Sequence, residues 1–270
     1  MEISEFSQKD IEALIETKNK LEERDRRLKE ELLLASELQK SLLPRDYPQD
    51  MPVEIIHRYI PYMDIGGDFF DYIRLDENRL GIIITDVSGH GIASAFLTAL
   101  FKGAFNHLAP KCNSAAETMA ALNAEFCSIV HTDHYLTAFY IILDTEKMTC
   151  EYCNAGHPKQ LLITKNDKIS ELTSGGFFLG MFDGTEYQSS RIKLHQGDTL
   201  CLFTDGIIET TGSDEALYDR ESIKGALRVT NGQSLELVAN YVMTDLLNFM
   251  SAPHFDDDIT LLLIKLVETI

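Results

Sequence analysis

The stretch 82–91, IIITDVSGHG, joins a short apolar run to a glycine-rich turn. Residues 82–85 are apolar or β-branched, which is typical of a strand buried on both faces. Asp86 follows directly, and Gly89 and Gly91 then mark a tight turn with a close backbone approach. The sequence therefore predicts a carboxylate at the end of a core strand.

A helix is expected directly after this turn, because apolar residues recur there at helical spacing. They are Ala93, Phe96, Leu97, Leu100, Phe101, Ala104, Phe105 and Leu108. The residues around Asp86 favour neither of two interpretations of its role over the other. It holds a metal ion on a rigid element, or it caps the helix, because Asp is a favoured N-cap residue.

The composition argues against several classes of protein. The 270 residues are 44% hydrophobic, which is enough for a core, and the formal net charge is −19. Such a charge argues against sequence-independent binding to nucleic acid or to an anionic membrane, because both need a basic surface. The N-terminus MEISEFSQKD is polar and acidic, unlike a signal peptide, and no apolar run is long enough to cross a bilayer. We therefore expect a cytoplasmic protein that binds no nucleic acid and does not insert into a membrane.

The five cysteines are expected to be reduced thiols, because an odd count without a secretion signal argues against a disulfide framework. Cys150 and Cys153 form one C-x-x-C pair within MTCEYCNAG, a strand-like segment. Positions three apart on a strand point to opposite faces, so we expect two ordinary buried cysteines rather than a metal or redox site.

Residues 1–44 are expected to form one long helix. One seam repeats every seven residues and is mostly leucine, whereas the second seam contains Lys18 and Asp25. The first seam consists of Leu14, Leu21, Leu28, Ala35 and Leu42. An imperfect parallel coiled-coil dimer is favoured, with a single helix laid against the following domain as the alternative. Prolines then make residues 45–52 a linker, and residues 53–270 form the main domain.

The rest of the chain is expected to alternate between groups of strands and amphipathic helices. Helices are expected at about 114–130, 215–228 and 233–250. Strands are expected at 53–60, 69–75, 80–86, 136–143, 149–154, 160–164, 187–194, 199–204 and 259–266.

Four acidic motifs lie at strand ends or glycine turns: Asp68, Asp86, Asp205 and Asp257. Asp68 follows two glycines, so the backbone can bring it close to another group, or it lies in solvent on a turn. The acids 256–258 precede an apolar strand and are costly there unless a cation neutralises them. Together the motifs indicate a site for hard divalent cations, Mg²⁺ or Mn²⁺, and hydrolysis of a phosphate ester. Their spacing does not distinguish a phosphatase from a nuclease, but the net charge favours a phosphatase.

Six motifs in this order and spacing resemble the SpoIIE/RsbU-type branch of the PPM metal-dependent protein phosphatases. They are GGDFFD, TDVSGHG, NAGHP, SGGFFLG, FTDGIIE and DDIT, and LQKSLLP resembles the linker helix of that branch. The resemblance covers about residues 53–267. It implies an α+β fold, a four-layer αββα sandwich of two antiparallel sheets flanked by helices.

The resemblance also implies two divalent metal ions, Mn²⁺ or Mg²⁺. Asp86, Asp205 and Asp257 would hold one ion, while Asp68, Asp86 and the carbonyl of Val87 would hold the other. The residues that would lie around these ligands are Gly67, Gly89, His90, Gly206 and Asp258. The choice of Asp257 over Asp258 as a ligand depends on aligning DDIT.

The reaction implied by the resemblance is hydrolysis of phosphoserine or phosphothreonine by a water that two metals activate. The implied substrate is a phosphorylated anti-sigma-factor antagonist of the STAS type in a bacterial partner-switching pathway. An upstream sensor or activator would act through the N-terminal helix of a homodimer. The alternatives are a catalytically idle binding module of the same fold and a two-metal phosphodiesterase.

Overall fold

A computed structural model describes residues 8–89, 91–131, 133–213, 215–251 and 255–267. The chain forms two compact units, residues 1–41 and residues 42–270, which we treat separately. Over the residues that the structure describes, no helix combines the length and the apolarity that a bilayer crossing requires.

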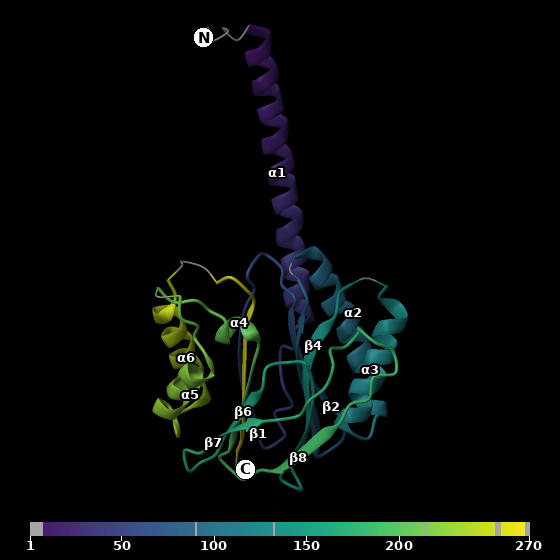
Figure 1. The fold of residues 1–270 in the computed structure, drawn as a ribbon, viewed down its shortest axis with the longest axis vertical. Helices are drawn as coiled ribbons and strands as arrows, with labels where there is room; N and C mark the ends of the chain where they lie inside the picture. The colour runs from purple at the N-terminus through teal and green to yellow at the C-terminus, as the bar shows by residue number, and fades with distance from the viewer. Residues whose placement is uncertain (1–7, 90, 132, 214, 252–254, 268–270) are drawn as a thin grey trace. The chain divides into compact units, whose positions relative to one another are not determined.

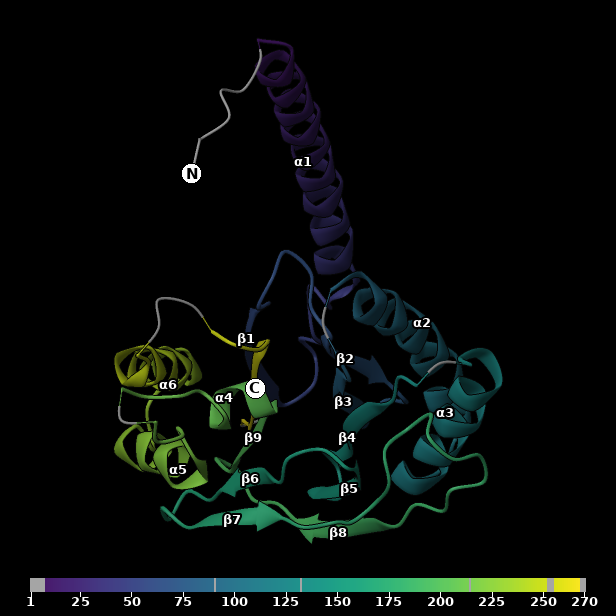
Figure 2. The ribbon, with the colours of Figure 1, turned by 45° about the horizontal axis from the view of Figure 1, so that its top comes forward.

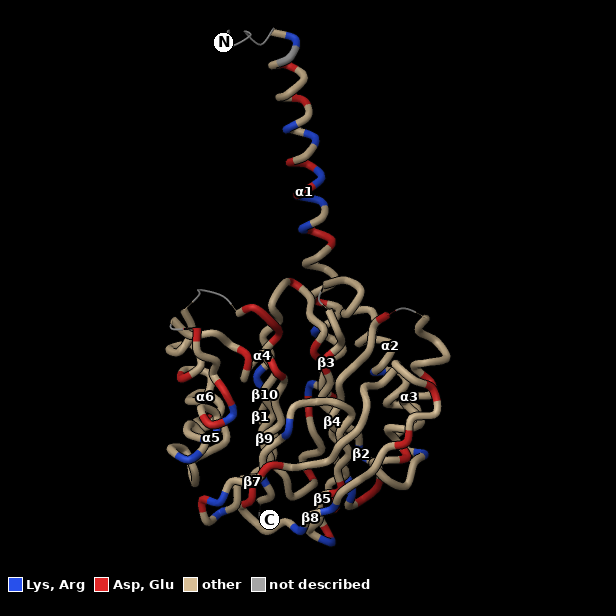
Figure 3. The backbone as a smooth tube through the Cα atoms, viewed as in Figure 1, with Lys and Arg blue, Asp and Glu red and all other residues tan. Residues whose placement is uncertain are grey.

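The first unit consists of helix α1 (Gln8–Leu42), whose last residue begins the second unit. Both signs of charge alternate along α1 (Figure 3). Several ion pairs join residues four apart, including Glu16–Lys20 and Glu23–Arg27. Such pairs each stabilise an exposed helix by about 0.3–0.5 kcal/mol. Leu14, Leu21 and Leu28 are more than half exposed on α1.

The second unit contains two five-stranded antiparallel sheets. One sheet, called sheet A, has the order β1-β10-β9-β6-β7, and the other, sheet B, has the order β2-β3-β4-β5-β8. The strands of sheet A are β1 (Val53–Ile60), β6 (Gln160–Ile163), β7 (Ile169–Leu172), β9 (Thr199–Phe203) and β10 (Ile259–Leu266). The strands of sheet B are β2 (Asp68–Arg74), β3 (Arg79–Val87), β4 (Leu136–Asp144), β5 (Thr149–Ala155) and β8 (Ser189–Lys193).

The two sheets pack face to face, and helices cover each outer face (Figures 1 and 2). Sheet B is covered by α2 (Ile92–Leu108) and α3 (Ala115–Ile129), with the short helix η1 (Ala109–Lys111) after α2. Sheet A is covered by α5 (Arg220–Val229) and α6 (Leu235–Phe249). A short helix, α4 (Asp205–Ile208), follows β9. This architecture is the four-layer αββα sandwich, so the predicted fold class is confirmed.

The central layer explains why alternate residues of these strands are apolar. Phe70, Ile84 and Phe139 from sheet B meet Leu202 and Leu262 from sheet A. β1 and β10, the first and last strands of the second unit, pair in antiparallel register from Val53 opposite Leu266 to Ile60 opposite Ile259.

Most predicted elements are present, with three differences. The four-residue strand β7 was not predicted, because the segment 169–172 contains too few residues to show a period. The helix predicted at 215–228 begins only at Arg220, since Asp219 accepts hydrogen bonds from the backbone N–H groups of Glu221 and Ser222 and caps it there. The short helix α4 at Asp205 was also not predicted.

The structure of the strand–turn–helix tests whether Asp86 caps the helix that follows it. Asp86 belongs to β3, and the N-cap residue of α2 is Gly91, which has a φ of 88° and no side-chain cap. The helix-capping interpretation of Asp86 is therefore wrong.

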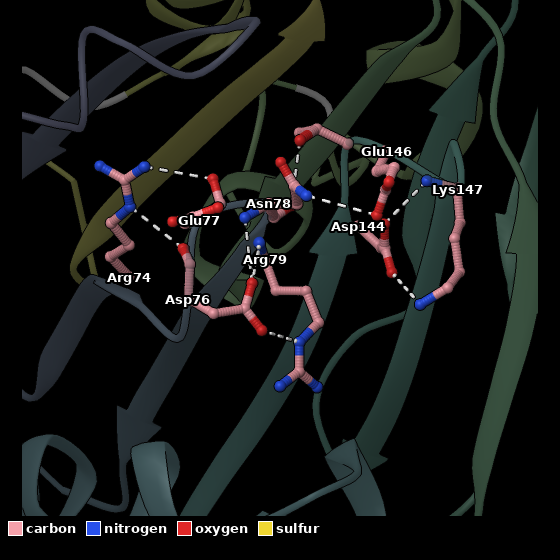
Figure 4. Close-up of polar contacts among 9 residues, drawn as sticks. Arg74, Asp76, Glu77, Asn78, Arg79, Asp144, Glu146 and Lys147 are labelled. Carbon is pink, nitrogen blue, oxygen red and sulfur yellow. Dashed lines mark hydrogen bonds and ion pairs between the residues drawn. The ribbon is translucent and has the colours of Figure 1, made fainter.

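The hairpin turns that join β2 to β3 and β4 to β5 lie at the ends of these strands that are away from Asp86 (Figure 4). Asp76 accepts hydrogen bonds from the backbone N–H groups of Asn78 and Arg79 and pairs with the Arg79 guanidinium. In the turn between β4 and β5, Asp144 binds Lys147 in the same manner. These contacts fix the hairpins, as expected for Asp in turns.

The two cysteines of the C-x-x-C pair lie on β5 and face opposite sides of sheet B. Cys150 belongs to the central layer, and Cys153 belongs to the core under α2 and α3. Burial raises the pKa of both thiols, that of Cys153 to about 12. This supports the interpretation of two ordinary buried cysteines.

Replacing a side chain of the central layer should destabilise the protein strongly. Phe70 is fully buried, so we expect Phe70→Ala to lower the free energy of unfolding by about 3–5 kcal/mol in urea titrations. Phe96→Ala removes the same group from a site that is 69% exposed and should change stability by less than about 0.5 kcal/mol. Equal losses in the two variants would contradict this packing.

Candidate metal centre

The apolar rows of the central layer end in polar side chains at one shared end. Alternate residues of each strand face this layer, so the next residue in each row keeps the same direction. The rows end in Asp68 beyond Phe70, Asp86 beyond Ile84, Thr204 beyond Leu202 and Thr260 before Leu262. The polar side chains thus meet between the two sheets.

Asp68 is held by contacts from both sheets. It pairs with Asp86 across β2 and β3, which places the two carboxylates on one face of sheet B. From sheet A, the hydroxyls of Thr204 and Thr260 donate to Oδ2 of Asp68 at 2.7 and 2.5 Å. Asp68 is 2% exposed, so the alternative that places it in solvent is wrong. Burial and the charges of Asp86 and Asp258 raise its pKa well above the usual range.

Asp86 and Asp205 lie in the same electrostatic environment. Burial raises the pKa of Asp86 to about 8, and the charges of Asp205, Asp257, Asp258 and Glu209 add to this effect. Burial, followed by the charge of Glu209, also raises the pKa of Asp205. The spacing of the four acids did not identify Glu209, which is four residues after Asp205 in FTDGIIE.

The structure separates the roles of Asp257 and Asp258. Asp258 is 4% exposed, and its carboxylate accepts N–H hydrogen bonds from Tyr62 at 2.7 Å and Gly67 at 2.5 Å. These donors stabilise its charge without a cation. Asp257 is exposed at the head of β10, and its Oδ1 accepts the N–H of Asp258. The expectation that all three acids 256–258 are costly without a cation was wrong, because only Asp258 is buried.

Glycines permit the close backbone approach at two points of the site. A Cβ on Gly206 would lie 2.1 Å from the carbonyl oxygen of Asp258, and a Cβ on Gly67 would lie 2.7 Å from that of Val87. Both positions therefore exclude a side chain unless the backbone moves. Gly89 has a φ of 86° in the turn before α2. His90 lies outside the described residues.

The motif NAGHP, residues 154–158, runs from the end of β5 in sheet B toward β6 in sheet A. His157 is 5% exposed, and its Nδ1 lies 2.7 Å from the hydroxyl of Thr137, which is opposite Asp86 on β4. Burial lowers the pKa of His157 to about 3, so the ring is neutral. Gln160 donates to the carbonyl of Phe203 and accepts its N–H, which fixes the end of β9. Sequence reasoning gave these residues no role.

The donors in this region fit a hard divalent cation. Among the described residues, no Lys, Arg or His forms an ion pair with Asp68, Asp86 or Asp205, although burial disfavours the charged form of each carboxyl. All the side chains offer oxygen, the donor type that Mg²⁺ and Mn²⁺ prefer. Within the described ranges, however, no three His, Cys, Asp or Glu side chains are already grouped as a metal site.

Comparison with known structures shows that the second unit has the fold of PP2C domains. The PP2C domain of SiaA from Pseudomonas aeruginosa superposes with a TM-score of 0.79 and 22% identity, over 90% of this chain and 98% of that one. The catalytic domain of the serine/threonine phosphatase PstP, solved with 2 manganese ions, superposes with a TM-score of 0.57 and 14% identity, over 80% and 99% of the chains.

The chain belongs to the SpoIIE family (Stage II sporulation protein E), whose model matches residues 76–267. It is 34% identical over 189 residues to the phosphoserine phosphatase RsbP of Bacillus subtilis, covering 68% of this chain and 47% of RsbP. It is 24% identical over 239 residues to the phosphoserine phosphatase RsbU of the same organism, covering 88% of this chain and 70% of RsbU. The resemblance to the SpoIIE/RsbU-type branch is thereby confirmed.

The stability of the metal-free protein should depend on Asp86. A raised pKa means that the folded protein holds the proton more tightly, so the free energy of unfolding should fall as the pH rises from about 4 to about 8. At pH 8 in EDTA, we expect Asp86→Asn to be more stable than wild type by about 1–2 kcal/mol in urea titrations.

The control for this experiment is Asp46→Asn, which removes an exposed carboxylate and should follow wild type at every pH. Mn²⁺ should raise the melting temperature of wild type at pH 8 more than that of Asp86→Asn. An Asp86→Asn variant that loses stability in parallel with wild type between pH 5 and 8 would show that Asp86 does not carry this repulsion.

Proposed function

We propose that this protein is a metal-dependent phosphatase that removes phosphate from serine or threonine in a protein. The observation that carries the proposal is the position of Asp86, which lies opposite Asp68 across β2 and β3 and whose pKa is raised by burial and by the charge of Asp205. The relatives named phosphoserine phosphatases support the same activity.

The metal ligands that we propose are those implied by the sequence motifs. Asp86, Asp205 and Asp257 would hold one ion, and Asp68, Asp86 and the carbonyl of Val87 would hold the other. Two Mn²⁺ or Mg²⁺ ions would supply positive charge for activating a water and for neutralising the phosphoryl oxygens. The chain's own contribution is to hold the carboxylates: Thr204 and Thr260 orient Asp68, and Asp258 fixes the backbone before it.

The substrate that we propose is a phosphorylated STAS-type anti-sigma-factor antagonist in a partner-switching pathway in the cytoplasm. The support is the similarity to RsbP and RsbU, of which this chain spans 47% and 70%. The net charge of −19 also makes a nucleic acid a poor substrate.

Hydrolysis of a phosphoserine peptide with and without Mn²⁺ tests this function. We expect turnover that requires the metal and that falls about 100-fold or more in Asp257→Asn, because this exposed carboxylate is one of the proposed metal ligands. Asp256→Asn removes the neighbouring exposed carboxylate and should keep both turnover and metal affinity near wild type.

Two results would contradict the proposal. If Asp257→Asn and Asp256→Asn were equally active and bound Mn²⁺ equally in calorimetry, the ligand assignment would be incorrect. If the protein bound Mn²⁺ but hydrolysed bis(p-nitrophenyl) phosphate in preference to the phosphopeptide, a phosphodiesterase would be the better assignment.

We also propose that residues 1–44 are a regulatory helix that dimerises, that 45–52 are a linker and that 53–270 are the catalytic domain. The support for dimerisation is the exposed leucine seam on α1, where Leu14, Leu21 and Leu28 recur every seven residues. An exposed apolar seam of this period favours a second helix as its partner. An upstream sensor or activator could then act on this helix.

Charges placed in the seam should prevent dimerisation. We expect the double variant Leu21→Asp and Leu28→Asp to sediment as a monomer where wild type sediments as a dimer, because each Asp would face its own copy across the seam. Leu33→Asp alters a leucine that is 58% exposed but lies outside both seams, and it should remain dimeric. A wild-type monomer, or a dimeric double variant, would rule out this role of the helix.

A further inference from the structure

A cavity of about 350 Å³ lies at the end of sheet A that is opposite the acids. Its lining includes Ile163 at the end of β6, Thr199 at the start of β9, Leu266 at the end of β10, and Leu235 and Val238 at the start of α6. Thr199 and Asp205 are six residues apart along one strand direction, about 20 Å. The cavity is therefore a site separate from the candidate metal centre.

The outer face of sheet A explains the position of this cavity. The rows Leu161–Ile163 on β6, Cys201–Phe203 on β9 and Leu261–Leu263 on β10 pack under α5 and α6. Continued by two residues, the same rows reach Lys165, Thr199 and Lys265. All three line the cavity, where the apolar rows end. Its inner wall is apolar because Ile163, Leu235 and Val238 are buried there.

Lys165 and Lys265 are the charged residues that line the cavity in the described part of the chain. Neither forms an ion pair with a described acidic side chain. The stem of Lys165 lies over Gly197, and Lys265 is half-buried. Glu54 is the cross-strand neighbour of Lys265, but no acidic side chain is among the described residues that line the cavity, so the charge of its lining is positive.

Neutral polar groups complete the lining. They are Gln196, Thr230, Asn231 and Gln233. The amide of Asn231 donates to Asp167, which therefore lies next to a lining residue although it does not line the cavity. Ligand pockets commonly combine an apolar wall, a few polar groups and a volume of ~300–1000 Å³.

We propose that this cavity is a binding site for a small amphipathic organic anion, with one acidic group between Lys165 and Lys265 and an apolar body against Ile163, Leu235 and Val238. The lysines supply charge-assisted hydrogen bonds, and the apolar wall supplies burial. The site does not depend on the proposed phosphatase activity, since no acid of the metal centre lines it.

The probe for the test is 8-anilinonaphthalene-1-sulfonate, an aromatic anion that fluoresces in apolar surroundings. We expect the full-length protein to bind it at one site per chain and octanoate to displace it, whereas 1-octanol should displace it much less. Lys265→Met keeps an apolar stem but removes the charge, so the dissociation constant should rise about tenfold.

Two variants serve as controls. Lys265→Arg keeps the positive charge and should bind the probe within a fewfold of wild type. Lys111→Met removes an exposed lysine on η1, which does not line the cavity, and should bind as wild type does. All variants should keep the melting temperature and the Mn²⁺-dependent phosphatase activity of wild type, which separates this site from the metal centre.

Three outcomes would overturn the proposal. They are the absence of saturable binding, an equal dissociation constant for Lys265→Met and wild type, and equal displacement by octanoate and 1-octanol. The last result would mean that the cavity selects apolar bodies without regard to charge.

Discussion

The repulsion among carboxylates buried at one end of the central layer is the constraint on which the site depends. Asp68 and Asp86 are cross-strand neighbours, and Asp205 follows the facing sheet's strand β9. The two sheets hold these acids together because the apolar layer below them is large and continuous. Burial of charge opposes folding at this end, and burial of apolar area compensates along the rest of each strand. A cation that relieves the repulsion is therefore coupled to the stability of the whole sandwich.

Much of this arrangement could be predicted from the sequence because each acid follows a strongly patterned strand. The run 82–85 before Asp86 and the run 199–203 before Asp205 each place an acid at a strand end. The contacts of Asp68 with Thr204 and Thr260 could not be predicted, because they join strands more than 130 residues apart. The burial of Asp258 beside exposed neighbours could not be predicted either, because it also depends on contacts between distant parts of the chain. Three adjacent acids look alike in sequence, and only the loop before β2 distinguishes them.

The two faces of sheet A carry polar side chains at opposite ends of the strands, near acids on the inner face and as lysines on the outer face. On the inner face, the rows of β9 and β10 end in Thr204 and Thr260, beside the acids. On the outer face, the rows of β6 and β10 end in Lys165 and Lys265, at the opposite end of the strands. The same alternation of side chains along a strand thus produces two polar regions, one beside acidic side chains and one with two lysines. They are separated by the length of the strands and by the apolar core between them.

The pairing of β1 with β10 places the beginning and the end of the αββα sandwich side by side, with Val53 opposite Leu266. The whole sandwich is thus a closed loop of chain with a single point of entry and exit. A segment fused before β1 and one fused after β10 would leave from the same edge of sheet A. Such a domain can be inserted into, or moved between, longer polypeptides without threading the chain through its fold. Any mechanical pull from an attached module would first load this one strand pair, and β10 leads directly to Asp258 and Asp257.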